Sequence, residues 1–378
     1  MPIALTIATL LLALLHYYIG SSLLPALDPG VVGEALSWLL LAASTLLMPA
    51  SLFSRRIAQL ANADRIAWAG SLAMGVFSSL LILTLLRDLL LAALAFTAPA
   101  LLTAALAYQS ALAVVMLAAA ITLAGYINAR RTAKVVQVDV PMANLPPELH
   151  GFTIAQISDI HVGPTIKRGY LDRIVDRVNH LQPDLIAVTG DLVDGSVRDL
   201  AHHTEPLKRL AARYGTYFVT GNHEYYSNAH AWIAEVERLG VRVLMNEHVV
   251  LEHQGAQLVV AGVTDYTAHH FDPAHRSDPL AALAGAPADA AARVLLAHQP
   301  RSAEAAANAG FDLQLSGHTH GGQFFPWNLF VPLQQPFTAG LHKLRDLWVY
   351  TSRGTGYWGP PKRIGAPSEI TRLRLVRA

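Results

Sequence analysis

Charge is distributed very unevenly along this chain, and that feature limits its fold more than any single motif does. Residues 1–128 contain eight charged residues, whereas the 250 residues that follow contain 47. Soluble domains usually carry about 25% charged residues, so the first part falls far short of this value and the second comes close to it. We therefore expect a membrane-embedded part followed by a water-soluble part. A wholly soluble protein and a wholly embedded one are both excluded.

Uncharged stretches in the first part are long enough to span a bilayer, which takes about 20 apolar residues. They are Pro2–Leu27, Ala35–Ser54, Ile66–Leu86 and Leu89–Ala129. The first has no Lys or Arg before its apolar run, so we interpret it as a retained helix and not as a signal peptide. Pro99 and the polar Tyr108-Gln109-Ser110 interrupt the last stretch. We expect one span there, at about Ala111–Asn128, which gives four spans; a fifth over Leu89–Ala107 is the alternative.

Loop charges indicate the orientation of these spans. The basic residues are Arg55, Arg56 and Arg65 in the second loop, and Arg130, Arg131 and Lys134 after the last span. Four spans with a cytoplasmic N-terminus place both groups inside, as the positive-inside rule expects. Arg87 and Asp88 fall at the predicted end of a span, so no ionisable residue is expected in the middle of one, and a plain anchor is favoured over a transporter. We expect a multi-pass protein of the inner (cytoplasmic) membrane with its soluble part in the cytoplasm.

Strands and helices alternate in the second part of the chain, which is typical of a layered α/β fold. We expect a linker over residues 129–150 with a short strand at Lys134–Val140, and a domain over residues 151–378. Strands are predicted at Phe152–Ser158, Leu185–Thr189, Thr216–Thr220, Val241–Leu244, Leu258–Gly262, Val294–Ala297, Leu313–Ser316, Trp348–Ser352 and Ile370–Leu375. Helices are predicted at Arg168–His180, Leu200–Arg213 and Ala229–Leu239.

Residues with metal-binding side chains follow five of the predicted strands. In chain order they are Asp159 and His161, Asp191, Asn222, His298, and His318 and His320. Ligands of open α/β sheets bind at the carboxyl ends of the strands, so these side chains should meet at one edge. A single Asp-x-His or one His at a strand end is weak evidence, but five strand ends in succession predict a metal site.

The types of these residues limit the metal. The chain has no Cys, and carboxylate, amide and imidazole ligands suit Mn, Fe, Zn, Mg or Ni. Seven ligands are too many for one tetrahedral site but fit two divalent ions that share a bridging carboxylate. Two such ions lower the pKa of a shared water and stabilise both oxygens of an in-line displacement at phosphorus. The pattern therefore predicts a hydrolase acting on phosphate esters.

These motifs resemble those of the calcineurin-like metallophosphoesterase superfamily over about residues 150–375. The matching segments are Asp159-x-His161, Gly190-Asp191, Gly221-Asn222-His223, His298 and Gly317-His318-x-His320. The resemblance implies two packed mixed β-sheets flanked by helices, joined here to an N-terminal transmembrane helical bundle. It also implies that one metal binds Asp159, His161, Asp191 and His320, and the other binds Asp191, Asn222, His298 and His318. His223 would be the catalytic acid, and Asp194 would orient it.

Finer features bear on the substrate. Gly195 stands where protein Ser/Thr phosphatases of this superfamily have a phosphate-binding Arg. The late segments with Gly321-Gly322, Arg353-Gly354 and Arg363 resemble the bacterial membrane-anchored YkuE-like phosphodiesterases. We expect cleavage of a phosphodiester or pyrophosphate, with a lipid-linked substrate as one option, Arg353 and Arg363 as substrate contacts, and manganese as the favoured metal. The alternatives are a phosphomonoesterase of the same fold, and a metal-bound sensor or scaffold without catalysis.

Two further expectations concern partners and surface residues. Lys and Arg number 28 against 27 acidic residues. This balance gives no basic surface, so nucleic acid is not expected as a partner. Five histidines outside the motifs are expected at the surface; they are His202, His203, His269, His270 and His275.

Overall fold

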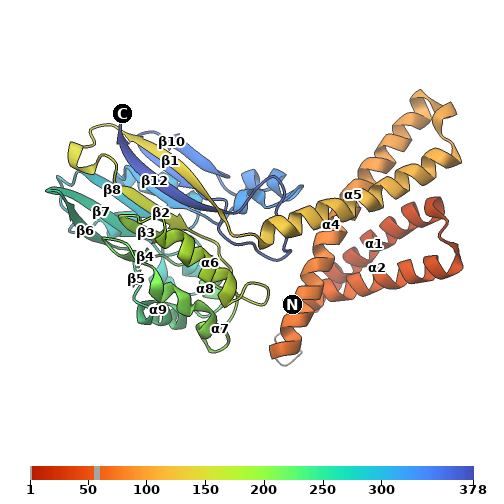
Figure 1. The fold of residues 1–378 in the computed structure, drawn as a ribbon, viewed down its shortest axis with the longest axis horizontal. Coiled ribbons are helices and arrows are strands. Elements are labelled where there is room, and N and C mark those ends of the chain that lie inside the picture. Colours follow the sequence, from red (N-terminus) through yellow and green to blue (C-terminus); the bar gives the residue numbers. More distant parts are fainter. Residues whose placement is uncertain (1, 55–59) are drawn as a thin grey trace. The chain divides into compact units, whose positions relative to one another are not determined.

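The computed structural model describes residues 2–54 and 60–378. The chain forms two compact units (Figure 1). One comprises Met1–Asn128 and Gly359–Lys362, and the other Ala129–Trp358 and Arg363–Ala378. Arg55 and Arg56, two of the basic residues used to predict the orientation, lie outside the described residues.

Long apolar helices build the first unit. They are α1 (Pro2–Leu27), α2 (Gly30–Leu52), α4 (Leu60–Thr97) and α5 (Ala104–Arg130). Each of the four is long and apolar enough to cross a membrane. The described residues thus contain the four helices expected for four spans, and a fifth over Leu89–Ala107 is not formed.

Helix α4 differs from the sequence prediction because it continues without a break through Arg87 and Asp88 to Thr97. Both charges therefore lie inside a helix and not at its end. Arg87 Nη1 is 2.9 Å from Asp88 Oδ1, and the Asp88 carboxylate accepts hydrogen bonds from the hydroxyls of Tyr18 and Ser22. The ion pair and these hydroxyls satisfy one another, which lets an apolar helix hold two charges.

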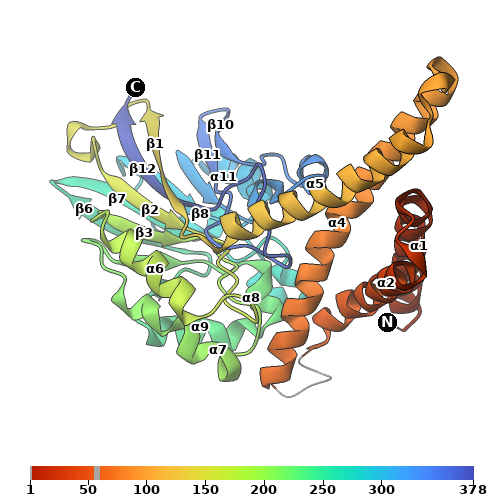
Figure 2. The ribbon, with the colours of Figure 1, turned by 45° about the vertical axis from the view of Figure 1, so that its right-hand side comes forward.

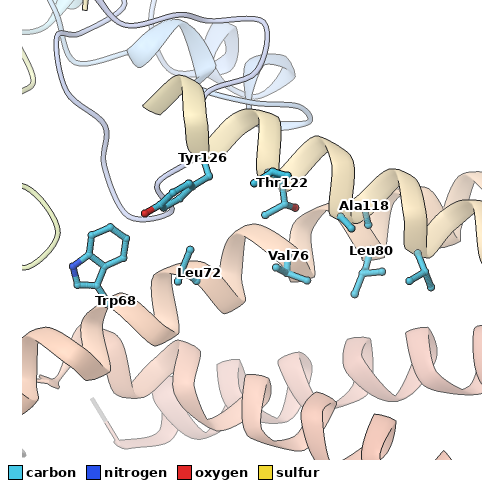
Figure 3. A pocket seen from close by; sticks show the side chains of 10 residues that line it. Trp68, Leu72, Val76, Leu80, Ala118, Thr122 and Tyr126 are labelled. Atoms are coloured by element: carbon cyan, nitrogen blue, oxygen red, sulfur yellow. The ribbon is translucent and has the colours of Figure 1, made fainter. Parts of the chain in front are cut away.

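A groove runs between α4 and α5 within this unit, with a volume of about 570 Å³ (Figure 3). Its lining is formed by Trp68, Leu72, Val76, Leu80, Val115, Ala118, Ala119, Thr122, Leu123 and Tyr126. Nearly all of these side chains are apolar, as expected for helices surrounded by acyl chains and not by water.

Two six-stranded mixed sheets form the second unit, which agrees with the two packed mixed sheets that the family resemblance implied. The first has the order β1-β12-β2-β3-β4-β5 and the second β10-β11-β9-β8-β7-β6. The strands of the first sheet are β1 (Lys134–Met142), β2 (Thr153–Ile157), β3 (Leu185–Val188), β4 (Thr216–Phe218), β5 (Arg242–Val243) and β12 (Glu369–Arg377). Those of the second are β6 (Glu247–His253), β7 (Ala256–Gly262), β8 (Ala292–Leu296), β9 (Leu313–Ser316), β10 (Gly340–Leu344) and β11 (Leu347–Thr351).

The core of this unit lies between the two sheets. Ile154 and Leu185 of the first sheet and Leu258 and Leu296 of the second are all fully buried there. Helices α6 (Arg168–Asn179), α7 (Val197–Thr204) and α9 (Ala229–Arg238) cover the outer face of the first sheet (Figure 2). The short helices α10 (Pro279–Ala282) and α11 (Ala303–Ala309) pack on the second sheet. This packing fixes the strand ends that carry the motifs.

Several elements differ from the sequence-based boundaries. Strand β1 pairs with β12 in parallel from Lys134 to Met142, so much of the predicted linker is an edge strand. The helix predicted at Leu200–Arg213 ends at Thr204 and continues as a 3-10 helix over Glu205–Arg209. Pro206 has no N–H to donate to an α-helical bond, which explains this change. Strands β6 and β10 were not predicted at all.

Candidate metal centre

The predicted ligands lie in the loops that follow strands of both sheets, all within the second unit. Asp159 and His161 follow β2, Asp191 follows β3, and His298 follows β8. His318 and His320 follow β9, and Asn222 begins the short helix α8 (Asn222–Tyr226) after β4. Since most of these strands are parallel to their neighbours, their carboxyl ends bring the ligands together.

Glycines in the motifs let these loops approach one another closely. A Cβ on Gly221 would lie 2.2 Å from Asp191 Oδ1, and one on Gly317 would lie 2.2 Å from Asp159 Oδ2. Neither position has room for a side chain. The loops therefore place backbone directly against two of the predicted carboxylate ligands.

Backbone strain is concentrated at the same residues. Five predicted ligands have positive φ angles between 51° and 69°; they are Asp159, His161, Asp191, His318 and His320. Residues other than glycine rarely adopt this conformation, and such strain gathers where function requires it. The strain supports the interpretation of these loops as a functional site.

Asp159, His161 and His320 form one group whose ligand atoms converge. His161 Nε2 lies 3.0 Å from His320 Nε2, and His320 Nε2 lies 3.5 Å from Asp159 Oδ1. The three ligand atoms all lie within 4.8 Å of one another. Two nitrogens and one carboxylate oxygen around a common point can hold a divalent ion.

Asp191, His298 and His318 form a second group of this kind. Asp191 Oδ2 lies 3.1 Å from His298 Nε2, and His298 Nε2 lies 3.2 Å from His318 Nδ1. Asn222 Oδ1 is buried and has no hydrogen-bond partner in the described protein. Leaving such an oxygen unpaired is costly, and a metal ion at this group would compensate that cost. The residues therefore fit a metal centre.

The predicted bridging role of Asp191 can be compared with its position. Its Oδ2 atom lies 3.1 Å from His298 in the second group and 3.9 Å from His161 in the first. Its other oxygen accepts a hydrogen bond from the backbone N–H of His223 at 2.9 Å. One oxygen of Asp191 thus faces both groups of ligands, while the other accepts a hydrogen bond from the backbone of α8.

Hydrogen bonds on the far side of the rings orient two of the histidines. His298 Nδ1 lies 2.8 Å from the carbonyl of Thr189, and His161 Nδ1 lies 3.1 Å from Asp194 Oδ1. With protons on these Nδ1 atoms, each Nε2 is free to bind a metal.

Asp194 also contacts the predicted acid. His223 Nδ1 lies 2.5 Å from the same Asp194 Oδ1 atom. Burial lowers the pKa of His223, but attraction by Asp191 and Asp194 outweighs burial and raises the pKa to about 10. Burial raises the pKa of Asp194, but the attraction of His161 and His223 outweighs burial. The pKa of Asp194 therefore lies well below its usual range. The two groups form an ion pair in the metal-free protein.

Arg363 is almost fully buried, which differs from the exposed position that a substrate contact requires. Its guanidinium donates to the carbonyls of His320, Arg353, Gly356 and Ala366. Its Nη2 atom also lies 2.9 Å from His320 Nδ1. These contacts indicate that Arg363 fixes the loop and ring of His320. Arg353, by contrast, is one-third exposed and pairs with the buried Glu369 at 2.9 Å.

Glu224 is a residue of the site for which the sequence motifs predicted no role. Its fully buried carboxylate accepts hydrogen bonds from the N–H groups of Gly221, Asp191 and Leu192 at 2.6, 3.0 and 2.8 Å. Burial and the nearby Asp191 raise the pKa of Glu224 to about 8. Glu224 ties the Asp191 loop to the Asn222 loop. The sequence feature that could have indicated this role is the position of Glu224 directly after Gly221-Asn222-His223.

Comparison with known proteins agrees with this class of fold and site. Residues 152–322 match the family model described as calcineurin-like phosphoesterase. A metallophosphoesterase of Campylobacter jejuni, described as uncharacterized, is 35% identical over 70% of this chain and 69% of its own length. The chain therefore belongs to the calcineurin-like phosphoesterase family.

Other relatives extend the similarity to membrane proteins. A protein of Bos taurus named "transmembrane protein with metallophosphoesterase domain" is 42% identical over 73% of this chain and 64% of its own length. The match thus spans less than two thirds of that relative. The metallophosphoesterase YkuE of Bacillus subtilis, also described as uncharacterized, is 29% identical over 61% of this chain and 81% of its own length.

Proposed function

We propose that the chain is a membrane-anchored phosphohydrolase that uses two divalent metal ions to cleave a phosphodiester or pyrophosphate bond. The observation that carries this proposal is the position of Asp191 Oδ2, 3.1 Å from one group of metal-binding side chains and 3.9 Å from the other. Asp159, His161 and His320 complete one metal site, and Asn222, His298 and His318 complete the other. Oxygen and nitrogen ligands suit Mn, Fe, Zn, Mg or Ni, and manganese is the metal that we favour among them.

A side chain of the protein supplies the proton that the leaving group needs. Two bound divalent ions would lower the pKa of a water and neutralise charge on the phosphoryl oxygens. His223 holds its Nδ1 proton on Asp194, and its Nε2 atom lies 4.0 Å from Asp191 Oδ2 at the edge of the centre. From there Nε2 donates a proton to the oxygen that leaves phosphorus.

Two features support the choice among alternatives. The pairing of His223 with Asp194 favours an enzyme over a catalytically idle sensor or scaffold, which has no need of a proton donor. Gly195 directly follows Asp194, at the position where phosphoprotein phosphatases carry a phosphate-binding Arg. This difference favours a diester or pyrophosphate over a phosphomonoester as the substrate. Of the two arginines considered as substrate contacts, the exposed Arg353 suits this role, while the buried Arg363 suits the positioning of His320.

A lipid-linked phosphate or pyrophosphate is the substrate that we favour. Residues 131–133 alone separate α5 from β1, so the soluble unit is tethered closely to a membrane helix. Trp358 is half exposed, and the centroid of its ring lies 5.6 Å from that of His223. An exposed aromatic side chain beside the proposed proton donor suits a substrate with an apolar part.

Orientation and subgroup belong to the same proposal. Arg65, Arg130, Arg131 and Lys134 favour a cytoplasmic soluble unit on the inner membrane. The bacterial YkuE-like subgroup stays a prediction, because the relatives of higher identity include animal transmembrane proteins. A reporter fused to the C-terminus tests orientation: periplasmic alkaline phosphatase activity would contradict it.

The function is tested with the purified full chain in Mn²⁺. We expect hydrolysis of bis-p-nitrophenyl phosphate and of lipid pyrophosphates, with little hydrolysis of p-nitrophenyl phosphate. Preference for the monoester would favour the phosphomonoesterase, and no hydrolysis of any of them would favour the scaffold. Equal rates on vesicle-bound lipid by the full chain and by residues 134–378 would contradict a role of the anchor in substrate access.

A further inference from the structure

His230, Asp272 and His275 form a further group of metal-binding side chains, which shares no residue with the proposed catalytic centre. His230 lies in the first turn of α9, and His275 ends the 3-10 helix Pro273–His275, with Asp272 just before it. One ligand atom from each residue lies within 4.8 Å of the other two. The sequence predicted His275 at the surface, yet its side chain is only 17% exposed.

Both imidazoles face one carboxylate oxygen. Asp272 Oδ2 lies 3.0 Å from His230 Nε2 and 3.9 Å from His275 Nε2. The first distance fits a hydrogen bond, whereas the second is too long for one. Ligand atoms of a tetrahedral zinc site lie roughly 3.4 Å apart, since zinc bonds to N and O measure about 2.0–2.2 Å. The distances of 3.0 and 3.9 Å lie on either side of this spacing. A small movement of the side chains therefore brings the ligand atoms to the spacing of a zinc site.

Contacts on the far side of the group orient two of its members. His275 Nδ1 lies 3.0 Å from the hydroxyl of Tyr225. Asp272 Oδ1 accepts the N–H of Ala274 at 2.9 Å, which leaves Oδ2 for the group. Such outer hydrogen bonds fix the tautomer and direction of metal ligands. This support distinguishes the group from histidines that merely share a surface.

We propose that His230, Asp272 and His275 bind a divalent transition metal, with zinc preferred. Two nitrogens and one oxygen suit Zn²⁺, while Mg²⁺ and Ca²⁺ prefer oxygen ligands. His230 is 69% exposed, so solvent reaches the open fourth position. The metal ties the loop between β7 and α10 to α9. Through Tyr225 on α8 it also stabilises the helix that carries Asn222 and His223.

Zinc content of the purified full chain in detergent tests the site. We expect wild-type protein equilibrated with Zn²⁺ to bind one equivalent more than His275→Gln, His230→Gln or Asp272→Asn. His270→Gln is the matched control, because His270 is exposed in the same loop and lies outside the group; it should bind as much as wild type. Equal zinc content in wild type and all three variants would overturn the proposal.

Proteolysis at Arg276 provides a second readout that needs no enzymatic activity. Arg276 is exposed and directly follows His275, so trypsin cleaves there when the loop opens. A ligand at 100 times its Kd lowers the open population about a hundredfold. Zn²⁺ should slow this cleavage in wild type and His270→Gln but not in His275→Gln. Cleavage at equal rates with and without Zn²⁺ in wild type would refute the site. Thermal unfolding measured in the presence of a chelator checks that each variant folds. An inactive wild type would contradict the proposed function, but it would affect neither the zinc content nor the cleavage rate.

Discussion

Arg363 Nη2 lies 2.9 Å from Nδ1 of His320, while Nε2 of the same ring lies 3.0 Å from His161 Nε2. Because Arg363 also binds the backbone carbonyl of His320, it fixes both the ring and the loop of one proposed metal ligand. We infer that an arginine so placed supports metal binding.

Arg363→Lys should therefore lower the affinity for Mn²⁺. Lysine keeps the charge but cannot reach several carbonyls with one planar fork. We expect a 10–100-fold weaker affinity, the usual effect of changing a residue that orients a metal ligand. The measurement is the Mn²⁺ concentration that gives half-maximal hydrolysis. Arg353→Lys is the control and should affect KM instead. A raised KM with unchanged Mn²⁺ affinity in Arg363→Lys would show that Arg363 contacts substrate.

Glu224→Gln should destabilise the soluble unit and reduce binding of both metals. Both oxygens of Glu224 accept backbone N–H groups, so the NH₂ group of Gln would face an N–H donor whichever way the amide is turned. Leaving a buried donor unpaired costs about 1–3 kcal/mol. Thermal unfolding and metal analysis measure the two effects. The control is Glu237→Gln, an exposed position on α9, which should change neither. Normal metal content in Glu224→Gln would mean that Glu224 does not position Asp191.

Asp191→Asn should abolish activity and lower the metal content to one ion or none. A single carboxylate faces both groups of ligands, and the neutral amide cannot compensate the repulsion of two cations. Elemental analysis of protein loaded with Mn²⁺ is the measurement. Asp289→Asn changes an exposed carboxylate and should retain both ions. Full occupancy by two metals in Asp191→Asn would defeat the bridging role.

His223→Ala should keep its metals but lose about 10²–10⁴-fold in turnover, the usual size of a general acid–base contribution. The loss should be smaller for substrates with good leaving groups, because these need little protonation. Turnover is compared for aryl esters of graded leaving-group pKa, with His180→Ala as the control at an exposed helix end. Loss of metal from His223→Ala would make His223 a ligand and would reverse the assigned roles.

Local properties of the sequence were enough to predict much of this protein. Apolar length predicted the membrane-spanning helices, because insertion depends on the hydropathy of continuous segments. The order of the strands that carry the motifs also agrees with the structure, and so does the fold of two mixed sheets that the family resemblance implied. The positions of these residues after successive strands predicted that their side chains would meet. The family resemblance implied their division into groups around Asp159 and Asp191, and the strands that carry them belong to both sheets.

Tertiary structure decided what depends on partners far away in the chain. The role of Arg363 rests on His320, 43 positions earlier, and no local pattern separates a buried arginine from one that binds substrate. The paired charges of Arg87 and Asp88 could lie within α4 because Tyr18 and Ser22 of another helix satisfy them. The group around His275 likewise forms only when α9 meets the loop after β7. Edge strands β6 and β10, by contrast, pair with the strands that directly follow them in the chain, β7 and β11. Hydropathy and strand-end chemistry are encoded locally, whereas the burial of charge and the partners that compensate it are set by packing.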